Sequence, residues 1–106
     1  MKQIVEFSSD KQTQTLNNIL SKDKGKYSVY DIFRILPYDI TYDGKRGYLS
    51  ISNSGIAYIS ISFNKKLNII YAENIRYSNA NIFDCFIKAL EWFKRNESSI
   101  VINAFD

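Results

Sequence analysis

Four basic residues stand in two predicted hairpin turns, where they could bind a phosphate backbone. The strand directions place both turns at the same end of a sheet, so we expect one basic rim there. Tyr42 and Tyr48 flank the first turn, and aromatic rings beside basic groups can stack nucleobases. This pattern gives a nucleic-acid-binding hypothesis that rests on Tyr42, Lys45, Arg46, Tyr48, Lys65 and Lys66.

The outward face of the same strands is a second candidate surface. Tyrosine and serine alternate there with aliphatic residues that face the core. Tyrosine buries a large area at low entropic cost, which suits a flat protein-binding site. The residues expected to contact a protein partner are Tyr48, Tyr58, Ser60, Ser62 and Ile70.

Both surfaces also have an explanation that involves no ligand. Charged hairpin tips are solvated and protect a sheet from edge-to-edge aggregation. A polar sheet face that carries tyrosines is equally typical of a solvated sheet back. The sequence leaves these alternatives open.

Catalytic side chains are scarce in this chain. It has no histidine, which excludes Ser-His-Asp and Cys-His mechanisms and removes the commonest general base. Cys85 is the single cysteine, so no intramolecular disulfide or multi-cysteine zinc site can form. Asp39 and Asp43 are the nearest carboxylate pair, but Asp43 is explained as a turn former. We therefore expect no enzyme activity, no metal and no cofactor.

The segment 44–47 (Gly-Lys-Arg-Gly) superficially suggests a phosphate-binding loop. It lacks the glycine-to-lysine spacing of such loops, and no helix follows it. A hairpin turn explains both glycines.

Strict alternation predicts an antiparallel meander over residues 38–72. Aliphatic or aromatic residues alternate with Asp, Thr, Ser, Asn or Tyr in four short runs. The runs are separated by Asp43-Gly44, by residues 53–55 and by residues 64–66, all of them turn-forming sequences. One face of such a sheet packs on the core, and the other is exposed to solvent.

Helical periodicity predicts helices near 10–22, 29–35 and 78–95. Ser28 and Asp31 have capping-box spacing, and Pro37 ends the second helix. The third begins at Ser78 or Asn79 and carries a broad apolar stripe, in which we expect Cys85 to be buried. Trp92 flanks the stripe, so we expect a partly buried packing role for it.

Strands are also predicted at both ends of the chain. Residues 2–7 are rich in β-formers, and an extra strand is weakly indicated at 75–77. Residues 99–103 form an almost continuous apolar run. Such a run is typical of a strand covered on both faces, so we expect a central position.

The fold class is therefore α+β: a mainly antiparallel sheet, with a four-strand meander plus N- and C-terminal strands, and two or three helices packed on one face. The length of 106 residues fits one domain over 1–106. The formal charge of +3 is modest for a committed nucleic-acid binder. No signal peptide or membrane span is visible, so a cytoplasmic location is expected.

The leading hypothesis is a non-enzymatic protein-binding domain, such as a small inhibitor or immunity-type protein. The alternative is a nucleic-acid-binding protein that uses the basic rim. A homodimer through the sheet edge or face is compatible with the sequence. Neither the partner nor the strand order can be deduced from it.

Overall fold

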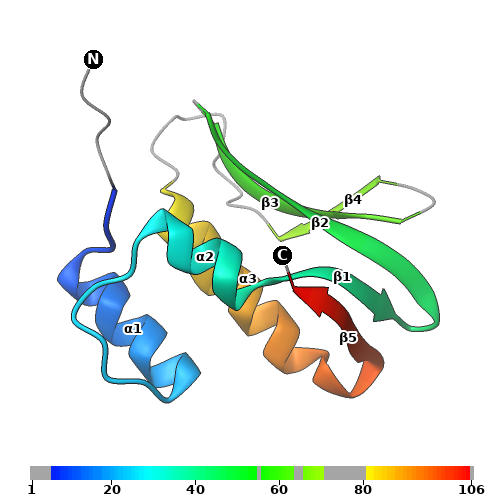
Figure 1. The fold of residues 1–106 in the computed structure, drawn as a ribbon, viewed down its shortest axis with the longest axis horizontal. Coiled ribbons are helices and arrows are strands. Elements are labelled where there is room, and N and C mark those ends of the chain that lie inside the picture. Colours follow the sequence, from blue (N-terminus) through cyan, green and yellow to red (C-terminus); the bar gives the residue numbers. More distant parts are fainter. Residues whose placement is uncertain (1–5, 55, 64–65, 71–80, 106) are drawn as a thin grey trace.

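The computed structural model describes residues 6–54, 56–63, 66–70 and 81–105. In these residues the chain forms three α-helices, five strands and a short 3-10 helix (Figure 1). The elements are α1 (Asp10–Leu20), α2 (Val29–Ile35), β1 (Pro37–Tyr42), β2 (Lys45–Ser54), β3 (Ile56–Ser62), β4 (Lys66–Ile70), α3 (Ile82–Arg95), η2 (Glu97–Ser99) and β5 (Ile100–Phe105). An antiparallel sheet with helices packed against it confirms the predicted α+β class.

The sheet has the strand order β4-β3-β2-β1-β5, and every neighbouring pair is antiparallel. The first four strands form the predicted meander. Asp43 (φ 52°) and Gly44 (φ 80°) make the β1–β2 turn, with positive φ at both positions as in a type I′ hairpin. Tyr48 pairs with Ser62, and Ser62 pairs with Lys66. The β1–β2 and β3–β4 turns therefore lie at the same end of the sheet.

Several predicted features fall outside the described residues. They are turn residues 55 and 64–65, most of the predicted strand 2–7 and the extra strand 75–77. Phe7 forms one antiparallel bridge with Ser28, and the Ser8 N–H donates to the Tyr27 carbonyl at 2.8 Å. The described part of the N-terminal segment therefore pairs with the loop before α2.

α1 and α2 match their predicted ranges to within two residues at each end. Ser9 and Gln12 form a capping box, because the Ser9 hydroxyl accepts from the Gln12 N–H (3.1 Å) and the Gln12 amide oxygen accepts from the Ser9 N–H (2.8 Å). At α2, the Asp31 carboxylate accepts from the Ser28 N–H at 2.7 Å. These contacts satisfy backbone donors that the first helical turn leaves free.

α3 supplies much of the core, although it begins later than predicted. Its N-cap is Asn81 rather than Ser78 or Asn79, and the Asn81 side chain accepts from the Phe83 N–H at 2.8 Å. Its buried residues are Ile82, Phe83, Cys85, Phe86, Ala89, Leu90 and Trp92. α3 packs on β3 and β4, while α1 and α2 pack on α3.

Cys85 and Trp92 both lie in this core. Cys85 is fully buried, as predicted, and its Sγ contacts the Ala57 carbonyl oxygen at 3.5 Å. The Trp92 ring centroid lies 5.1 Å from that of Tyr42 and 5.2 Å from that of Phe93. Trp92 is thus more deeply buried than expected and joins α3 to β1.

β5 contradicts the prediction of a central strand covered on both faces. It lies at the edge of the sheet beside β1, and all its residues after Ile100 are exposed. β3, β2 and β1 occupy the inner positions, and the short connection through η2 brings the chain to the free edge of β1. Because α3 covers the β3–β4 half of the sheet, the helical layer leaves β5 largely open (Figure 1).

Gly47 has a packing role that a hairpin turn does not explain. It lies within β2, opposite Ile40. A Cβ atom at this position would stand 2.4 Å from Cε1 of Phe63 and 2.8 Å from Cγ2 of Ile61. Gly47 is therefore required because the Phe63 ring lies directly over the β2 backbone.

We expect Gly47→Ala to lower the free energy of unfolding by about 1–3 kcal/mol, since the new methyl group overpacks this contact. Urea unfolding followed by Trp92 fluorescence measures the change. Gly25→Ala is the matched control, because nothing lies within 4 Å of its Cβ position. Equal stability of the two variants would contradict the packing role.

Candidate protein-interaction site on the sheet

One cation of the predicted basic rim, Arg46, already has a carboxylate partner. Lys45 is exposed beside the β1–β2 turn, but the Arg46 side chain is paired with Asp39. Lys65 lies outside the described residues, and only the backbone of Lys66 is described, as the first residue of β4. The turns share one end of the sheet, but the charge at that end is partly neutralised.

Arg46 and Asp39 form a two-point ion pair on the outer face of the sheet, the face opposite the helices. Nε of Arg46 lies 3.1 Å from each carboxylate oxygen of Asp39, and Nη2 lies 2.6 Å from Oδ2. The hairpin register explains the contact, because Thr41 stands opposite Arg46 and Asp39 is then its diagonal neighbour. Asp39 is buried, whereas most of the Arg46 side chain remains exposed.

Asn103 of β5 completes the surroundings of this carboxylate. Its Nδ2 donates to Oδ1 of Asp39 at 3.2 Å and to the Thr41 hydroxyl at 2.9 Å. The hydrogen bonds from Arg46, with a smaller contribution from Asn103, hold the pKa of Asp39 below its usual range, although burial opposes this shift. The carboxylate is therefore ionised at neutral pH and fixes Arg46 in place.

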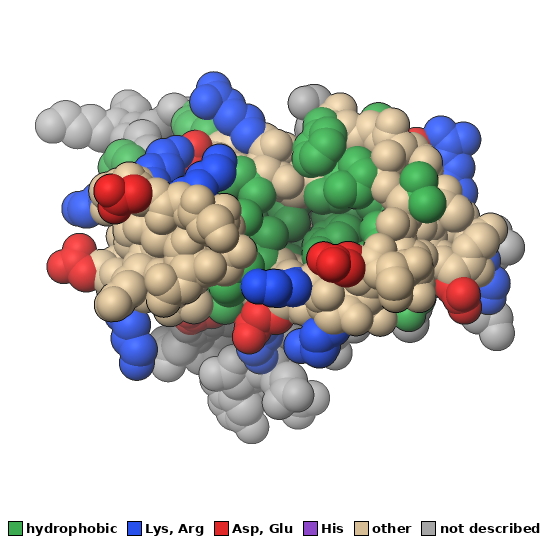
Figure 2. All heavy atoms as spheres, turned by 90° about the horizontal axis from the view of Figure 1, so that it is seen from below, with side chains coloured by type: hydrophobic (Ala, Val, Ile, Leu, Met, Phe, Trp, Pro, Cys, Tyr) green, Lys and Arg blue, Asp and Glu red, His purple; other side chains and the backbone are tan. Residues whose placement is uncertain are grey.

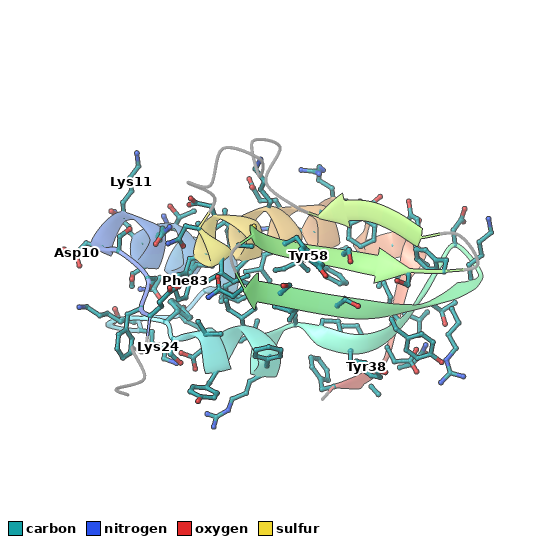
Figure 3. The ribbon with its side chains drawn as sticks, turned by 90° about the horizontal axis from the view of Figure 1, so that it is seen from above. Asp10, Lys11, Lys24, Tyr38, Tyr58 and Phe83 are labelled. Atoms are coloured by element: carbon teal, nitrogen blue, oxygen red, sulfur yellow. The ribbon has the colours of Figure 1, made fainter. Side chains whose placement is uncertain are left out.

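Two tyrosines extend the ion pair into a larger surface. The Arg46 guanidinium carbon lies 5.6 Å from the Tyr48 ring centroid, and that centroid lies 5.5 Å from the Tyr38 ring. Tyr38 and Tyr48 are 47% and 39% exposed. We call Tyr38, Asp39, Arg46 and Tyr48 the Tyr–Arg cluster; Figure 3 labels Tyr38 beside β1. The cluster is a preformed surface of aromatic rings around one fixed guanidinium group.

Tyr38 reaches this cluster at an irregularity in the sheet. The β1–β5 register shifts between Pro37 and Asp39 and again between Asp39 and Ile40. Regular alternation would have placed Tyr38 with Ile40 on the helix side. The alternation breaks at this bulge, so sequence periodicity did not identify Tyr38 as a surface residue.

Tyr42 lies apart from the Tyr–Arg cluster. Its half-buried ring packs against Trp92 and lies 6.2 Å from the Phe63 ring, on the helix side of the sheet. Tyr42 flanks the β1–β2 turn as predicted, but its ring packs towards the core on the helix side and lies on the opposite face from Arg46 and Tyr48.

The predicted Tyr/Ser face is present on the outer side of β2 and β3, but its members differ in exposure. Tyr58 and Ser62 are half-buried, and Tyr58 is visible on this face in Figure 3. Ser60 is fully buried, so it offers no surface to a partner. The backbone of Ile70 pairs with Ile59 across a register shift, and its side chain lies outside the described residues.

Sequence analysis also missed the exposed apolar surface of β5. Val101, Ile102 and Phe105 are 60%, 49% and 55% exposed, and the strand contains no charged residue. Val101 pairs with Thr41, so β5 continues the sheet directly beside the Tyr–Arg cluster. The apolar run at 99–103 indicates this surface, but the same run is also typical of a buried strand, which is what the sequence analysis predicts.

The two carboxylates that were considered for catalysis have separate structural roles. Asp39 binds Arg46 and Asn103, whereas Asp43 is an exposed turn residue whose N–H donates to the Ser99 carbonyl at 2.9 Å. Within the described ranges, no group of three or more His, Cys, Asp or Glu side chains could hold a metal ion. None of the helices in the same ranges has the length and apolar character needed to cross a bilayer.

Comparison of the chain with protein-family models, curated proteins and solved structures finds no match. The functional assignment therefore depends on the geometry of this chain. That geometry offers fixed aromatic and guanidinium groups on an open sheet surface, an arrangement suited to binding.

Asp39→Asn should destabilise the protein at neutral pH, because Arg46 and Asn103 stabilise the ionised carboxylate in the folded state more than water does in the unfolded state. The stability difference from the wild type should be full above the ordinary aspartate pKa of about 3.9. It should shrink as the pH falls below that value towards the lowered pKa of Asp39. Urea unfolding at a series of pH values measures the difference.

The variant Arg46→Gln, alone and combined with Asp39→Asn, completes a double-mutant cycle for this ion pair. Once the guanidinium group is removed, Asp39→Asn should have a smaller effect, because the two side chains act as a pair. A stability difference that does not change with pH, or that is additive with Arg46→Gln, would contradict the role assigned to this ion pair.

Proposed function

We propose that this chain is a non-enzymatic protein-binding domain that contacts its partner through the Tyr–Arg cluster. The observation that carries the proposal is the fixed position of Arg46, which pairs with buried Asp39 and lies over the Tyr48 ring. Tyrosine and arginine are among the residues that contribute most to protein–protein affinity.

Preorganisation is the physical reason that this arrangement favours binding. A free arginine loses much side-chain entropy when a partner immobilises it. In this protein, three short contacts to Asp39 hold the Arg46 side chain before any partner arrives. Tyr38 and Tyr48 pack on one another and have few torsions to order, so they also bind at low entropic cost.

The surroundings of the cluster suit a broad, flat contact. Exposed Ser50 and half-buried Tyr58 extend it across β2 and β3, with hydroxyl groups available for hydrogen bonds. Val101 on the opposite side adds exposed apolar surface. An aromatic centre with polar and aliphatic borders is typical of protein interfaces.

An inhibitor or immunity-type role is the form of protein binding that we propose. Such a protein acts by covering a surface of its partner and needs no catalytic group of its own. The fixed binding surface formed by the Tyr–Arg cluster supports this role. The commitment of Asp39 to Arg46 supports it too, because a carboxylate with a lowered pKa is a poor proton acceptor at neutral pH.

Nucleic-acid binding is the alternative, and the charges distinguish it. Phosphate binding needs cations that can release counterions, and Arg46 is already paired with a carboxylate. Lys45 remains exposed at the rim. If the rim binds nucleic acid, affinity must fall steeply with salt concentration.

The variant Tyr48→Ser tests the proposed surface. We expect the wild-type protein, immobilised and exposed to nuclease-treated extract of its source cells, to retain a specific protein that Tyr48→Ser loses by at least about tenfold, as expected for a hot-spot residue. Quantitative mass spectrometry of the retained proteins measures this loss.

Tyr30→Ser is the matched control, since Tyr30 is 65% exposed on α2 and lies outside the cluster. It should retain the partner as the wild type does. The contact lies elsewhere if Tyr48→Ser still retains the partner protein, or if Tyr48→Ser and Tyr30→Ser lose it to the same extent. The alternative is favoured if the protein captures a partner only from extract that was not treated with nuclease. It should then also bind labelled DNA or RNA with an affinity that falls with salt concentration.

A further inference from the structure

β5 leaves one edge of the sheet without a partner strand among the described residues. Its six residues, Ile100–Phe105, carry no charge, and Val101, Ile102 and Phe105 are about half exposed or more. Natural proteins usually protect an exposed edge with lysine, proline or a covering segment. β4, at the other edge, begins with Lys66, whereas β5 has no such residue. Before the bulge at Asn103, the β5 edge is therefore the one suited to pairing.

The register of β5 assigns its side chains to the two faces of the sheet. Ile100 and Ile102 stand opposite Tyr42 and Ile40, which lie on the helix side. Val101 stands opposite Thr41 on the outer face. An added strand would therefore meet apolar side chains on both faces before the register shift near Asn103.

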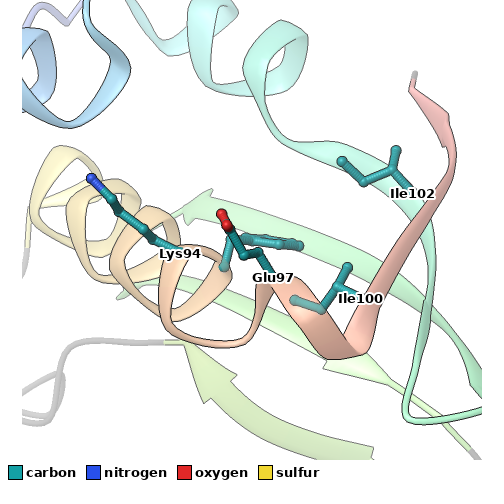
Figure 4. Close-up of a pocket in the computed structure, with 5 residues that line it drawn as sticks. Lys94, Glu97, Ile100 and Ile102 are labelled. Atoms are coloured by element: carbon teal, nitrogen blue, oxygen red, sulfur yellow. The ribbon is translucent and has the colours of Figure 1, made fainter.

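A groove on the helix side adjoins this edge. Phe93, Ile100 and Ile102 form its apolar part, and its volume is about 350 Å³ (Figure 4). Hydrophobic side chains also gather in a hollow when the molecule is seen from below (Figure 2). The groove gives an incoming strand a place for aliphatic side chains, as in other cases of strand addition.

The groove carries one basic and one acidic side chain, so the grooves of two copies can be complementary in charge. Lys94 and Glu97 both line it and are exposed. The ion pairs found within the described ranges are Lys24–Asp31 and Arg46–Asp39, so neither Lys94 nor Glu97 is paired there. In a twofold-symmetric contact, a lysine of each copy can meet the glutamate of the other.

We propose that β5 pairs antiparallel with β5 of a second copy of this chain, which forms a homodimer with one continuous sheet. A twofold axis normal to the sheet keeps each residue on its own face, so Ile100 and Ile102 of one copy meet their counterparts beside the two grooves. Lys94 of each copy then lies near Glu97 of the other. The dimer does not require the proposed function, although Val101 borders both surfaces, and it places two Tyr–Arg clusters on the same face of the shared sheet.

Sedimentation velocity over a concentration series tests the dimer. We expect the wild type to dimerise below about 1 mM. Val101→Lys should remain monomeric, because it introduces a charge at an exposed edge position. Its thermal melt should match that of the wild type at a dilution at which the wild type is also monomeric. Tyr30→Lys introduces the same charge on α2 and should dimerise as the wild type does.

Charge reversal tests the symmetry of the contact. Lys94→Glu and Glu97→Lys should each weaken self-association by at least about tenfold, because they replace two attractive contacts with repulsive ones. An equimolar mixture of the two variants should dimerise again, since the two acidic groups of one variant then face the two basic groups of the other. The proposal is wrong if the wild type stays monomeric at about 1 mM, if Val101→Lys dimerises normally, or if mixing restores nothing.

Discussion

The position of α3 on the sheet determines most of this structure. Its apolar stripe packs on β3 and β4, and α1 and α2 pack on α3 rather than over β5. The β3–β4 half is therefore covered, whereas the part of the chain that the structure describes brings the end of α3 to the β1–β5 half, where Trp92 reaches Tyr42. Beyond that contact, Ile102 lies at the border of an open groove. The exposed edge follows directly from this off-centre helical layer.

The same half of the sheet carries the fixed polar cluster on its outer face. Asp39 is buried there without helices to cover it, because Arg46 and Asn103 occupy its oxygens from neighbouring strands. A buried carboxylate is tolerated when such partners satisfy it. The ion pair orders Arg46 against Tyr48, and Tyr48 packs on Tyr38. Stability and the proposed binding surface therefore depend on the same contacts.

Much of the architecture could be predicted from local patterns, and the failures have identifiable physical causes. Alternation identified the meander, and Asp43-Gly44 identified the hairpin turn with positive φ. The apolar run in β5 was misread because a buried strand and an apolar edge strand have the same composition. The hairpin turn does not explain Gly47. A glycine is needed there because the side chain of Phe63, distant in sequence, packs against the backbone, and no local pattern reveals this contact.

The candidate site was only partly predictable for similar reasons. Arg46 and Tyr48 were identified, and the hairpin register could also have paired Asp39 with Arg46 as diagonal neighbours. Tyr38 and Asn103 could not be found in this way, because both lie at shifts in the β1–β5 register. Asn103 also belongs to a strand whose place in the sheet depends on tertiary packing.

The most direct test of the central claim is an NMR measurement of the Arg46 side chain at neutral pH. Its Nε–H should give a distinct, slowly exchanging signal with cross-relaxation to the Tyr48 ring, and Asp39→Asn should abolish both features. Arg34, which is exposed on α2, provides the internal reference. If the Arg46 signal exchanges as fast as that of Arg34 in the wild type, the guanidinium group is not fixed and the preformed Tyr–Arg surface does not exist.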